Sequence, residues 1–265
     1  MFPRIASLAS ALLLGLAPFN WADSPKKLLL VGQGPDGHPP QTHEYMAGVK
    51  LLEKLLERAG KFDITVVRAD GPWREGPELI ELSDGVVFFV SEGAKWLQHD
   101  EKRFNALTNV AKRGGGVVGL HWAVGCKDAK FVDPFLQVLG ACHGGPDRKY
   151  QELETNVSLA EGKHPILTGI EPFRVRDEFY YRLKVAKSEK AIQPLLLAKI
   201  DGSNEMVSWA WERPDGGRSF GFSGLHFHEN WKLPPYRRLV TQGVLWTLKL
   251  PVPEGGVPVD VKETE

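Results

Sequence analysis

Short apolar runs that alternate with longer amphipathic stretches constrain the fold of this chain more than any other feature. The run at residues 28–31 is wholly apolar, as is typical of a strand buried on both faces of a parallel sheet. Residues 44–60 then carry apolar side chains at helical spacing and end at Gly60, which predicts an amphipathic helix. Further strand-like runs lie at residues 64–67, 85–90 and 117–120, with another helix expected between Asp100 and Arg113. This alternation predicts an α/β fold with a flavodoxin-like, doubly wound, mostly parallel sheet and helices on both faces.

The pattern changes in the C-terminal half, beyond Gly140. Shorter alternating runs follow at residues 156–159, 191–200, 206–211 and 218–223. They predict an additional, partly antiparallel region. A last helix is expected at residues 234–248, whereas residues 251–265 have no regular period and are predicted to form an extended tail. The 265 residues, 42% of them hydrophobic, suffice for one substantial core, so residues 26–250 are predicted to form a single domain.

The N-terminus has the order of a secretory signal peptide. Arg4 precedes an apolar stretch at residues 5–17, and a small residue, Ala22, comes before polar sequence. Residues 1–22 are therefore predicted to be a signal peptide that is cleaved near Ala22. The apolar stretch is shorter than the roughly 20 residues that span a bilayer, so no stable membrane insertion is expected after cleavage. The predicted location of the mature protein is periplasmic or secreted.

Charge and cysteine content exclude some classes of function. Lys and Arg number 33, as do Asp and Glu, so the formal net charge is +0 and no overall field attracts nucleic acid. A polar small molecule is the expected partner, and the sequence indicates no oligomeric state. Cys126 and Cys142 are too few for a disulfide scaffold. In an oxidising compartment they could form one bridge, or they could be two buried thiols.

Histidines gather where strands are expected to end. Five of the eight lie there, namely His38 and His43 after the first strand, His121 after the strand at 117–120, and His226 and His228 after the strand at 218–223. Ligands of open α/β sheets bind at the carboxyl ends of strands, and neutral imidazoles are good ligands for first-row metals. His43, His121 and His226 are therefore predicted to hold a divalent, zinc-like metal. Hydrogen-bonding roles for the same histidines remain the alternative.

Further side chains are candidates for proton transfer and substrate contact. Asp177 and Glu178 are adjacent carboxylates, and one of them is expected to act as general base or metal ligand, unless the two are simply a solvated acidic pair. His143 and His228 are expected to act as acids or orienting groups. Flat aromatic side chains for a sugar ring are expected from Trp122, Tyr180 and Trp231, with core packing as the alternative. His121 stands at a strand-to-helix junction, where related α/β enzymes expose a nucleophile, but no Ser or Cys occupies that point.

Several segments together resemble the ThuA-like (trehalose utilisation) family over Lys26 to Leu250. The segments are residues 28–31, His43, Gly114 to His121, His143, His164 to Ile166, Asp177 to Tyr180, Trp209, Gly217 to Arg218 and Gly224 to His226. The resemblance implies membership of the class I glutamine-amidotransferase-like superfamily. Because His121 and Trp122 occupy the neighbourhood of the attacking cysteine, a functional glutamine amidotransferase is not implied. The family suggests sugar catabolism, and processing of oxidised (keto) disaccharides or glycosides.

The sequence therefore predicts an exported carbohydrate-processing enzyme with a His/carboxylate site. It would be a metal-dependent hydrolase or lyase of (keto-)glycosides, with no nucleotide cofactor. The alternative is a non-catalytic sugar-binding module that uses the same pocket. Turnover of disaccharides and their 3-keto forms separates the two, because only the enzyme gives products.

Overall fold

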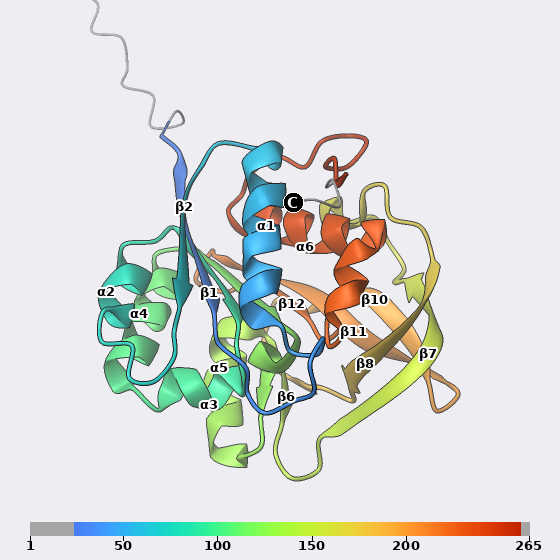
Figure 1. Cartoon of the computed structure of the whole chain (residues 1–265), viewed down its shortest axis with the longest axis horizontal. Helices are drawn as coiled ribbons and strands as arrows, with labels where there is room; N and C mark the ends of the chain where they lie inside the picture. The colour runs from blue at the N-terminus through green and yellow to red at the C-terminus, as the bar shows by residue number, and fades with distance from the viewer. Residues whose placement is uncertain (1–23, 261–265) are drawn as a thin grey trace, which may run out of the picture.

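A central mixed sheet of nine strands organises the molecule, which is described from a computed structural model over residues 24–260 (Figure 1). The predicted signal peptide, residues 1–22, and the last five tail residues lie outside the described residues. One half of the sheet is parallel in the order β2-β1-β3-β4-β12. Its strands are β1 (Lys26–Gly32), β2 (Phe62–Arg68), β3 (Gly85–Phe89), β4 (Gly116–Leu120) and β12 (Arg218–Phe222). This half has the predicted flavodoxin-like order.

The other half of the sheet is antiparallel and continues from β12 in the order β11-β10-β7-β8. Its strands are β11 (Ser203–Glu212), β10 (Gln193–Ile200), β7 (Lys149–Leu159) and β8 (Phe173–Tyr181). The prediction of a mostly parallel sheet with a partly antiparallel C-terminal region is confirmed in part: four strand pairings are parallel and four are antiparallel, so the antiparallel part is larger than predicted. The reason lies in the connections: β10, β11 and β12 are joined by short turns, whereas parallel neighbours need a long crossover.

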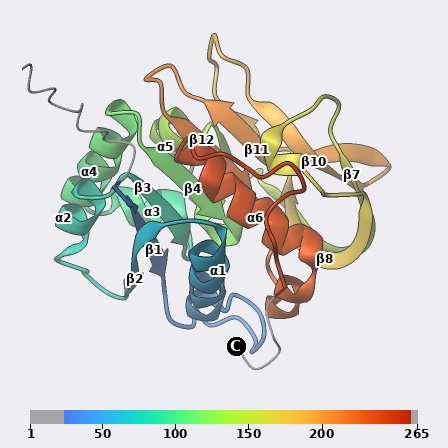
Figure 2. The ribbon, with the colours of Figure 1, turned by 90° about the horizontal axis from the view of Figure 1, so that it is seen from above.

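Helices cover both faces of the sheet, as predicted (Figure 2). On one face lie α1 (Tyr45–Ala59) and α6 (Pro234–Thr247). On the other face lie α2 (Gly76–Glu81), α3 (Gly93–Gln98), α4 (Glu101–Lys112) and α5 (Val132–Leu139). Successive strand side chains alternate between the faces, so Leu28 and Leu30 join the core under α1 and α6, while Leu29 and Val31 join the core under the other helices. The uninterrupted apolar run of β1 follows from its burial on both sides.

A small second sheet lies next to the carboxyl ends of the parallel strands. It consists of β5 (Gly125–Cys126), β6 (Ala141–Gly144) and β9 (Lys184–Val185). Short 3-10 helices lie at η2 (His121–Val124), η3 (Ala129–Phe131), η4 (Pro165–Leu167) and η5 (His228–Lys232). Cys126 and Cys142 are buried free thiols in this sheet that hydrogen-bond to each other. No helix among residues 24–260 is long and apolar enough to cross a bilayer.

Residues 251–260 of the C-terminal segment form neither helix nor strand, and they pack against the domain. Val257 is fully buried, and its backbone N–H donates a hydrogen bond of 3.0 Å to the side-chain oxygen of Gln242 in α6. Arg237 and Arg238, also in α6, donate to the carbonyls of Val259 and Val257. This stretch therefore forms part of the packed layer over α6.

One buried arginine ties three parts of the fold together. Arg213, directly after β11, is 0% exposed and pairs with Asp215 at 3.1 Å. Its guanidinium also donates to the carbonyls of Arg218 and Gly115 and to the hydroxyl of Ser219, at 2.8, 2.6 and 2.7 Å. A further bond reaches the carbonyl of residue 111 in α4 at 3.2 Å. The donors of this side chain thus satisfy carbonyls from α4, the loop before β4, and β12.

Candidate metal centre

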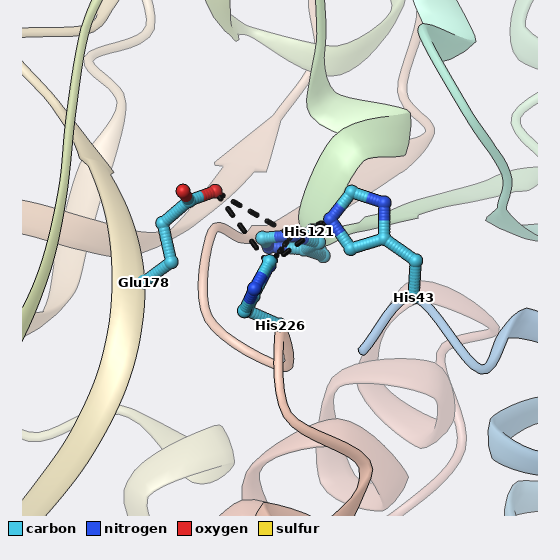
Figure 3. Close-up of side chains that lie close together, drawn as sticks. All are labelled: His43, His121, Glu178 and His226. Atoms are coloured by element: carbon cyan, nitrogen blue, oxygen red, sulfur yellow. Dashed lines mark hydrogen bonds and ion pairs between the residues drawn. The ribbon is translucent and has the colours of Figure 1, made fainter. Parts of the chain in front are cut away.

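Four side chains from distant segments converge at the carboxyl ends of the parallel strands (Figure 3). They belong to His43, His121, Glu178 and His226, and their ligand atoms all lie within 4.8 Å of one another. His43 Nε2 lies 3.0 Å from both His226 Nδ1 and His121 Nε2, and the latter two atoms are 3.3 Å apart. Glu178 Oε1 lies farther out, 3.9 Å from His121 Nε2 and 3.7 Å from His226 Nδ1. The three histidines predicted as ligands therefore meet at one point.

A sharp turn presents His121. It is the first residue after β4, and its φ of 49° lies in the left-handed region, which residues with a Cβ rarely adopt and which clusters at functional sites. The turn brings its ring to the end of the neighbouring strand β12, where Nδ1 bonds the carbonyl of Ser223 at 2.9 Å. The strand-to-helix junction, which carries a nucleophile in many α/β enzymes, carries an imidazole here.

Two loops pair to bring His43 and His226 together. The loop before α1 and the loop after β12 form an antiparallel bridge between Thr42 and Phe227. Around it, the His43 N–H donates to the carbonyl of His226 at 3.0 Å, and the His228 N–H donates to the carbonyl of Gln41 at 2.8 Å. Residues 183 apart in sequence thus become neighbours through backbone hydrogen bonds.

Strand alternation separates the two adjacent carboxylates. Asp177 and Glu178 lie within β8, so their side chains point to opposite faces of the sheet. Glu178 and Tyr180 face the histidines, whereas Asp177 is fully buried on the other side. Asp177 accepts hydrogen bonds from the N–H groups of Leu225 and His226 at 2.7 and 3.1 Å, and from the Tyr236 hydroxyl at 2.9 Å. It is a positioning residue that holds the His226 loop, not a group at the cluster.

Burial controls the protonation of the cluster. It lowers the pKa of His121 well below its usual value, with the charges of His43 and His226 adding to the effect. It likewise lowers the pKa of His43, and that of His226 to about 4. Burial, together with the nearby Asp177 charge, raises the pKa of Glu178 to about 7. The imidazoles are therefore neutral at pH 7, which is the form that binds metal ions.

The tautomers leave nitrogen lone pairs facing one another. The Ser223 carbonyl can only accept, so His121 Nδ1 carries the proton and its Nε2 does not. His43 Nδ1 lies 2.9 Å from the Asp36 carboxylate, which fixes its proton in the same way. Two lone pairs consequently meet at 3.0 Å, a repulsive arrangement that a shared cation relieves. In tetrahedral zinc sites with Zn–N bonds of about 2.0–2.1 Å, ligand nitrogens lie about 3.3–3.4 Å apart, so a small outward movement of the rings from their spacing of 3.0–3.3 Å would admit the ion.

Asp36 supports the cluster from behind His43. Burial raises its pKa, but hydrogen bonds from His43, Tyr45 and His38 outweigh burial and hold the pKa below its usual value. The Tyr45 hydroxyl donates to Asp36 Oδ2 at 2.7 Å, and His38 Nδ1 lies 2.7 Å from Oδ1. A carboxylate behind a histidine is the arrangement that orients metal-binding imidazoles and raises their basicity.

Asp36→Asn is expected to weaken binding of a divalent metal by about 10–100-fold, because the amide no longer fixes the His43 proton as a carboxylate does. The measurement is a competition titration against a chromophoric chelator. Asp63→Asn, at an exposed position of β2, is the matched control and should leave the affinity unchanged. Equal affinities for the two variants would contradict the role given to Asp36.

Comparison with known proteins places the chain in a family. The family profile described as ThuA, trehalose utilisation, matches residues 30–247. The chain belongs to the ThuA family. A solved ThuA-like protein from Bacteroides uniformis matches at 16% identity with a TM-score of 0.65, covering 87% of this chain and 95% of that one. A cytoplasmic protein from Salmonella typhimurium LT2 matches at 13% identity with a TM-score of 0.56, covering 83% and 99%.

The likeness of this ThuA-family chain to glutamine amidotransferase folds is more distant. The glutaminase domain of CTPS from Trypanosoma brucei matches at 12% identity with a TM-score of 0.44, covering 89% of this chain and 100% of that one. No curated protein matches the sequence. At these identities the two solved structures with TM-scores of 0.65 and 0.56 establish the fold alone.

A cavity of about 180 Å³ opens from the cluster of the ThuA-family chain. It is lined by His38, His43, Trp122, Lys127, His143, Arg148, Tyr150, Glu178 and Tyr180. Tyr180 lies between two histidine rings, stacked on His143 with centroids 4.0 Å apart and on His121 at 4.8 Å. Its hydroxyl lies 3.1 Å from His121 Nε2. Three of the predicted contact and acid/base residues, Trp122, Tyr180 and His143, therefore line the cavity next to the cluster.

Two predicted residues lie elsewhere, and several were missed. His228 begins η5 and Trp231 is buried in the core against Phe89, so the structure brings neither to the cluster or the cavity. The residues missed by sequence analysis are Asp36, His38 and Tyr45 behind the cluster, and Lys127, Arg148 and Tyr150 along the cavity. His38 could have been identified as a site residue, because it is a histidine close to the end of a predicted strand. The others lie in loops, or at the start of a strand or helix, with no local pattern that marks them.

Proposed function

We propose that this protein is an exported, metal-dependent enzyme that cleaves a sugar or keto-sugar glycoside by hydrolysis or elimination. The observation that carries the proposal is the meeting of three neutral imidazoles, with the lone pairs of His43 and His121 facing each other, next to a partly buried glutamate. The description of the family as trehalose utilisation supports a carbohydrate substrate. The N-terminal pattern of residues 1–22 supports export to the periplasm or medium.

His43, His121 and His226 would hold the ion. A divalent ion bound there would polarise a carbonyl or hydroxyl oxygen of the sugar. Glu178 Oε1 lies 3.7–3.9 Å from the nearest histidine nitrogens, so the carboxylate is within reach of a group bound at the same point. We assign it the transfer of a proton from water or from a sugar carbon.

The cavity walls would position the sugar. Trp122 and Tyr180 offer apolar ring surface, and His143 adds a neutral hydrogen-bonding group beside them. Burial lowers the pKa of His143 to about 3, so at neutral pH the ring is uncharged and can both donate and accept a hydrogen bond.

Glu178→Gln is expected to lower kcat by about 100–10,000-fold, the usual contribution of a positioned acid or base. Metal content should stay at the wild-type level, because the three histidines remain. Elemental analysis and steady-state kinetics on the same preparation check both parts. Glu154→Gln is the control, since the Glu154 side chain on β7 is 58% exposed and pairs with Arg174 away from the cluster. Unchanged turnover in Glu178→Gln would exclude the glutamate from the chemistry.

The decisive experiment is turnover of a panel of disaccharides and their 3-keto forms, with and without a chelator. The proposal predicts glycosidic cleavage that chelation abolishes and added divalent metal restores. Binding of a panel member without any product would instead identify a sugar-binding module. Export is checked by sequencing the N-terminus of the mature protein, which should begin near residue 23.

A further inference from the structure

The mouth of the cavity differs in charge from its floor. The floor is formed by buried side chains, among them His43, His143 and Tyr180. The mouth carries Arg148, which is half-buried, and Lys127, whose side chain is 65% exposed. Both cations line the same cavity that opens onto the histidine cluster.

Of these two cations, Arg148 has no carboxylate partner in the described part of the chain and Lys127 shares its only one. Among residues 24–260 no carboxylate lies within ion-pair distance of the Arg148 guanidinium, which donates only to the carbonyl of Gly145 at 3.2 Å. Lys127 Nζ lies 3.9 Å from Glu92, a carboxylate that Lys95 also approaches, at 3.8 Å. By contrast, the nearby Lys184 is neutralised by Asp147 at 2.6 Å. Within the described residues, the mouth therefore keeps the unpaired charge of Arg148, together with a Lys127 charge that a shared Glu92 offsets only in part.

The positive field extends to the floor of the cavity. Burial lowers the pKa of His143, and the charges of Arg148 and Lys184 lower it further. The ring is 2% exposed, and its Nδ1 has no hydrogen-bond partner among the described residues. A ligand that enters past Arg148 thus meets a neutral polar ring within a positive field.

We propose that the substrate carries an anionic substituent, a carboxylate or a phosphate, that binds to Arg148 and Lys127 while its sugar ring lies over the histidine cluster. A planar guanidinium pairs with either anion through charge-assisted hydrogen bonds. The cavity of about 180 Å³ is smaller than pockets for drug-sized ligands, so it takes a single ring with its substituent. The position of the sugar ring over the histidine cluster rests on the proposed function. The contacts of the anion with Arg148 and Lys127 do not depend on a metal.

The test compares binding of D-glucose with that of D-glucuronate, D-gluconate and D-glucose 6-phosphate, by calorimetry at low ionic strength. At least one anionic sugar is expected to bind about tenfold or more tightly than glucose. Comparison of the uronate and the aldonate with the phosphate shows whether a carboxylate or a phosphate is the preferred anionic group. The preference should disappear in the double variant Arg148→Gln/Lys127→Gln and weaken as salt is raised.

The matched control is Lys163→Gln/Lys187→Gln, which removes the same charge from exposed positions outside the cavity and should keep the preference. Every measurement is repeated on chelator-treated protein, because a carboxylate can also bind a metal directly. A preference that persists without metal and depends on Arg148 and Lys127 supports the inference, even if metal analysis and turnover refute the proposed enzyme. Four results would overturn the inference of an anionic substrate. These are equal affinities for glucose and the anionic sugars, a preference for glucose, no binding of any anionic sugar, and a preference for the anion that is unchanged in the double variant.

Discussion

The His121→Ala/His226→Ala variant is expected to lose its divalent metal while remaining folded. Two of three converging imidazoles disappear, and a single histidine with a glutamate cannot replace them. Affinity should fall by much more than the roughly 10–100-fold that follows loss of a residue outside the coordination sphere. The wild-type protein, expressed in medium with trace metals, should carry about one ion per chain by elemental analysis.

His228→Ala provides the matched control for this prediction. It removes another histidine from the same loop, two residues from His226, but its ring does not belong to the cluster. Its metal content should equal that of the wild type. Circular dichroism confirms that the variants fold. A metal-free wild-type protein that is fully folded, or a double variant that keeps the ion, would refute the metal centre.

Arg213→Ala is expected to lower the free energy of unfolding by about 2–4 kcal/mol, because it removes a fully buried guanidinium that bonds several buried acceptors, although its ion-pair partner Asp215 is exposed. The loss also leaves the carbonyls of Gly115 and Arg218 and the buried Ser219 hydroxyl without this donor. Because these acceptors lie on both β12 and the loop before β4, the effect should spread across the parallel half of the sheet.

Urea unfolding followed by far-UV circular dichroism measures this change. Arg174→Ala is the control, since the Arg174 side chain is 64% exposed and pairs with an equally exposed Glu154 on the outside of the β7–β8 pair. Removal of that surface pair should cost no more than about 1 kcal/mol. Similar losses in the two variants would contradict the role given to the buried network of Arg213.

Much of the fold could be predicted because the burial of a strand or helix determines its local pattern of apolar and polar residues. The run at 28–31 is apolar throughout since both its faces are covered, and α1 has its apolar stripe where a helix must face the sheet. The direction of the strands in the second half of the chain produces no such pattern in the sequence. An alternating strand such as β11 looks the same whether its neighbour is parallel or antiparallel, and only the shortness of its connections decides.

The site could be predicted where chemistry coincides with the end of a strand. His121 follows β4 directly and His226 lies in the loop after β12, so the pairing of these two neighbouring strands brings them near each other. Asp177 was misassigned because the segment was not recognised as a strand, in which adjacent side chains point apart. Asp36 and Arg148 depend on how irregular loops fold back, which no periodicity reveals.

The bridge between Thr42 and Phe227 also bears on when the centre can form. The four converging side chains are distributed from position 43 to position 226, across both halves of the sheet. During synthesis the set is incomplete until almost the whole chain has emerged, and a chain that crosses a membrane unfolded can carry no ion in this arrangement. If the protein is exported unfolded, as proposed, folding finishes outside the cytoplasm. The identity of the bound metal would then depend on the ions available in that compartment rather than on those of the cytoplasm.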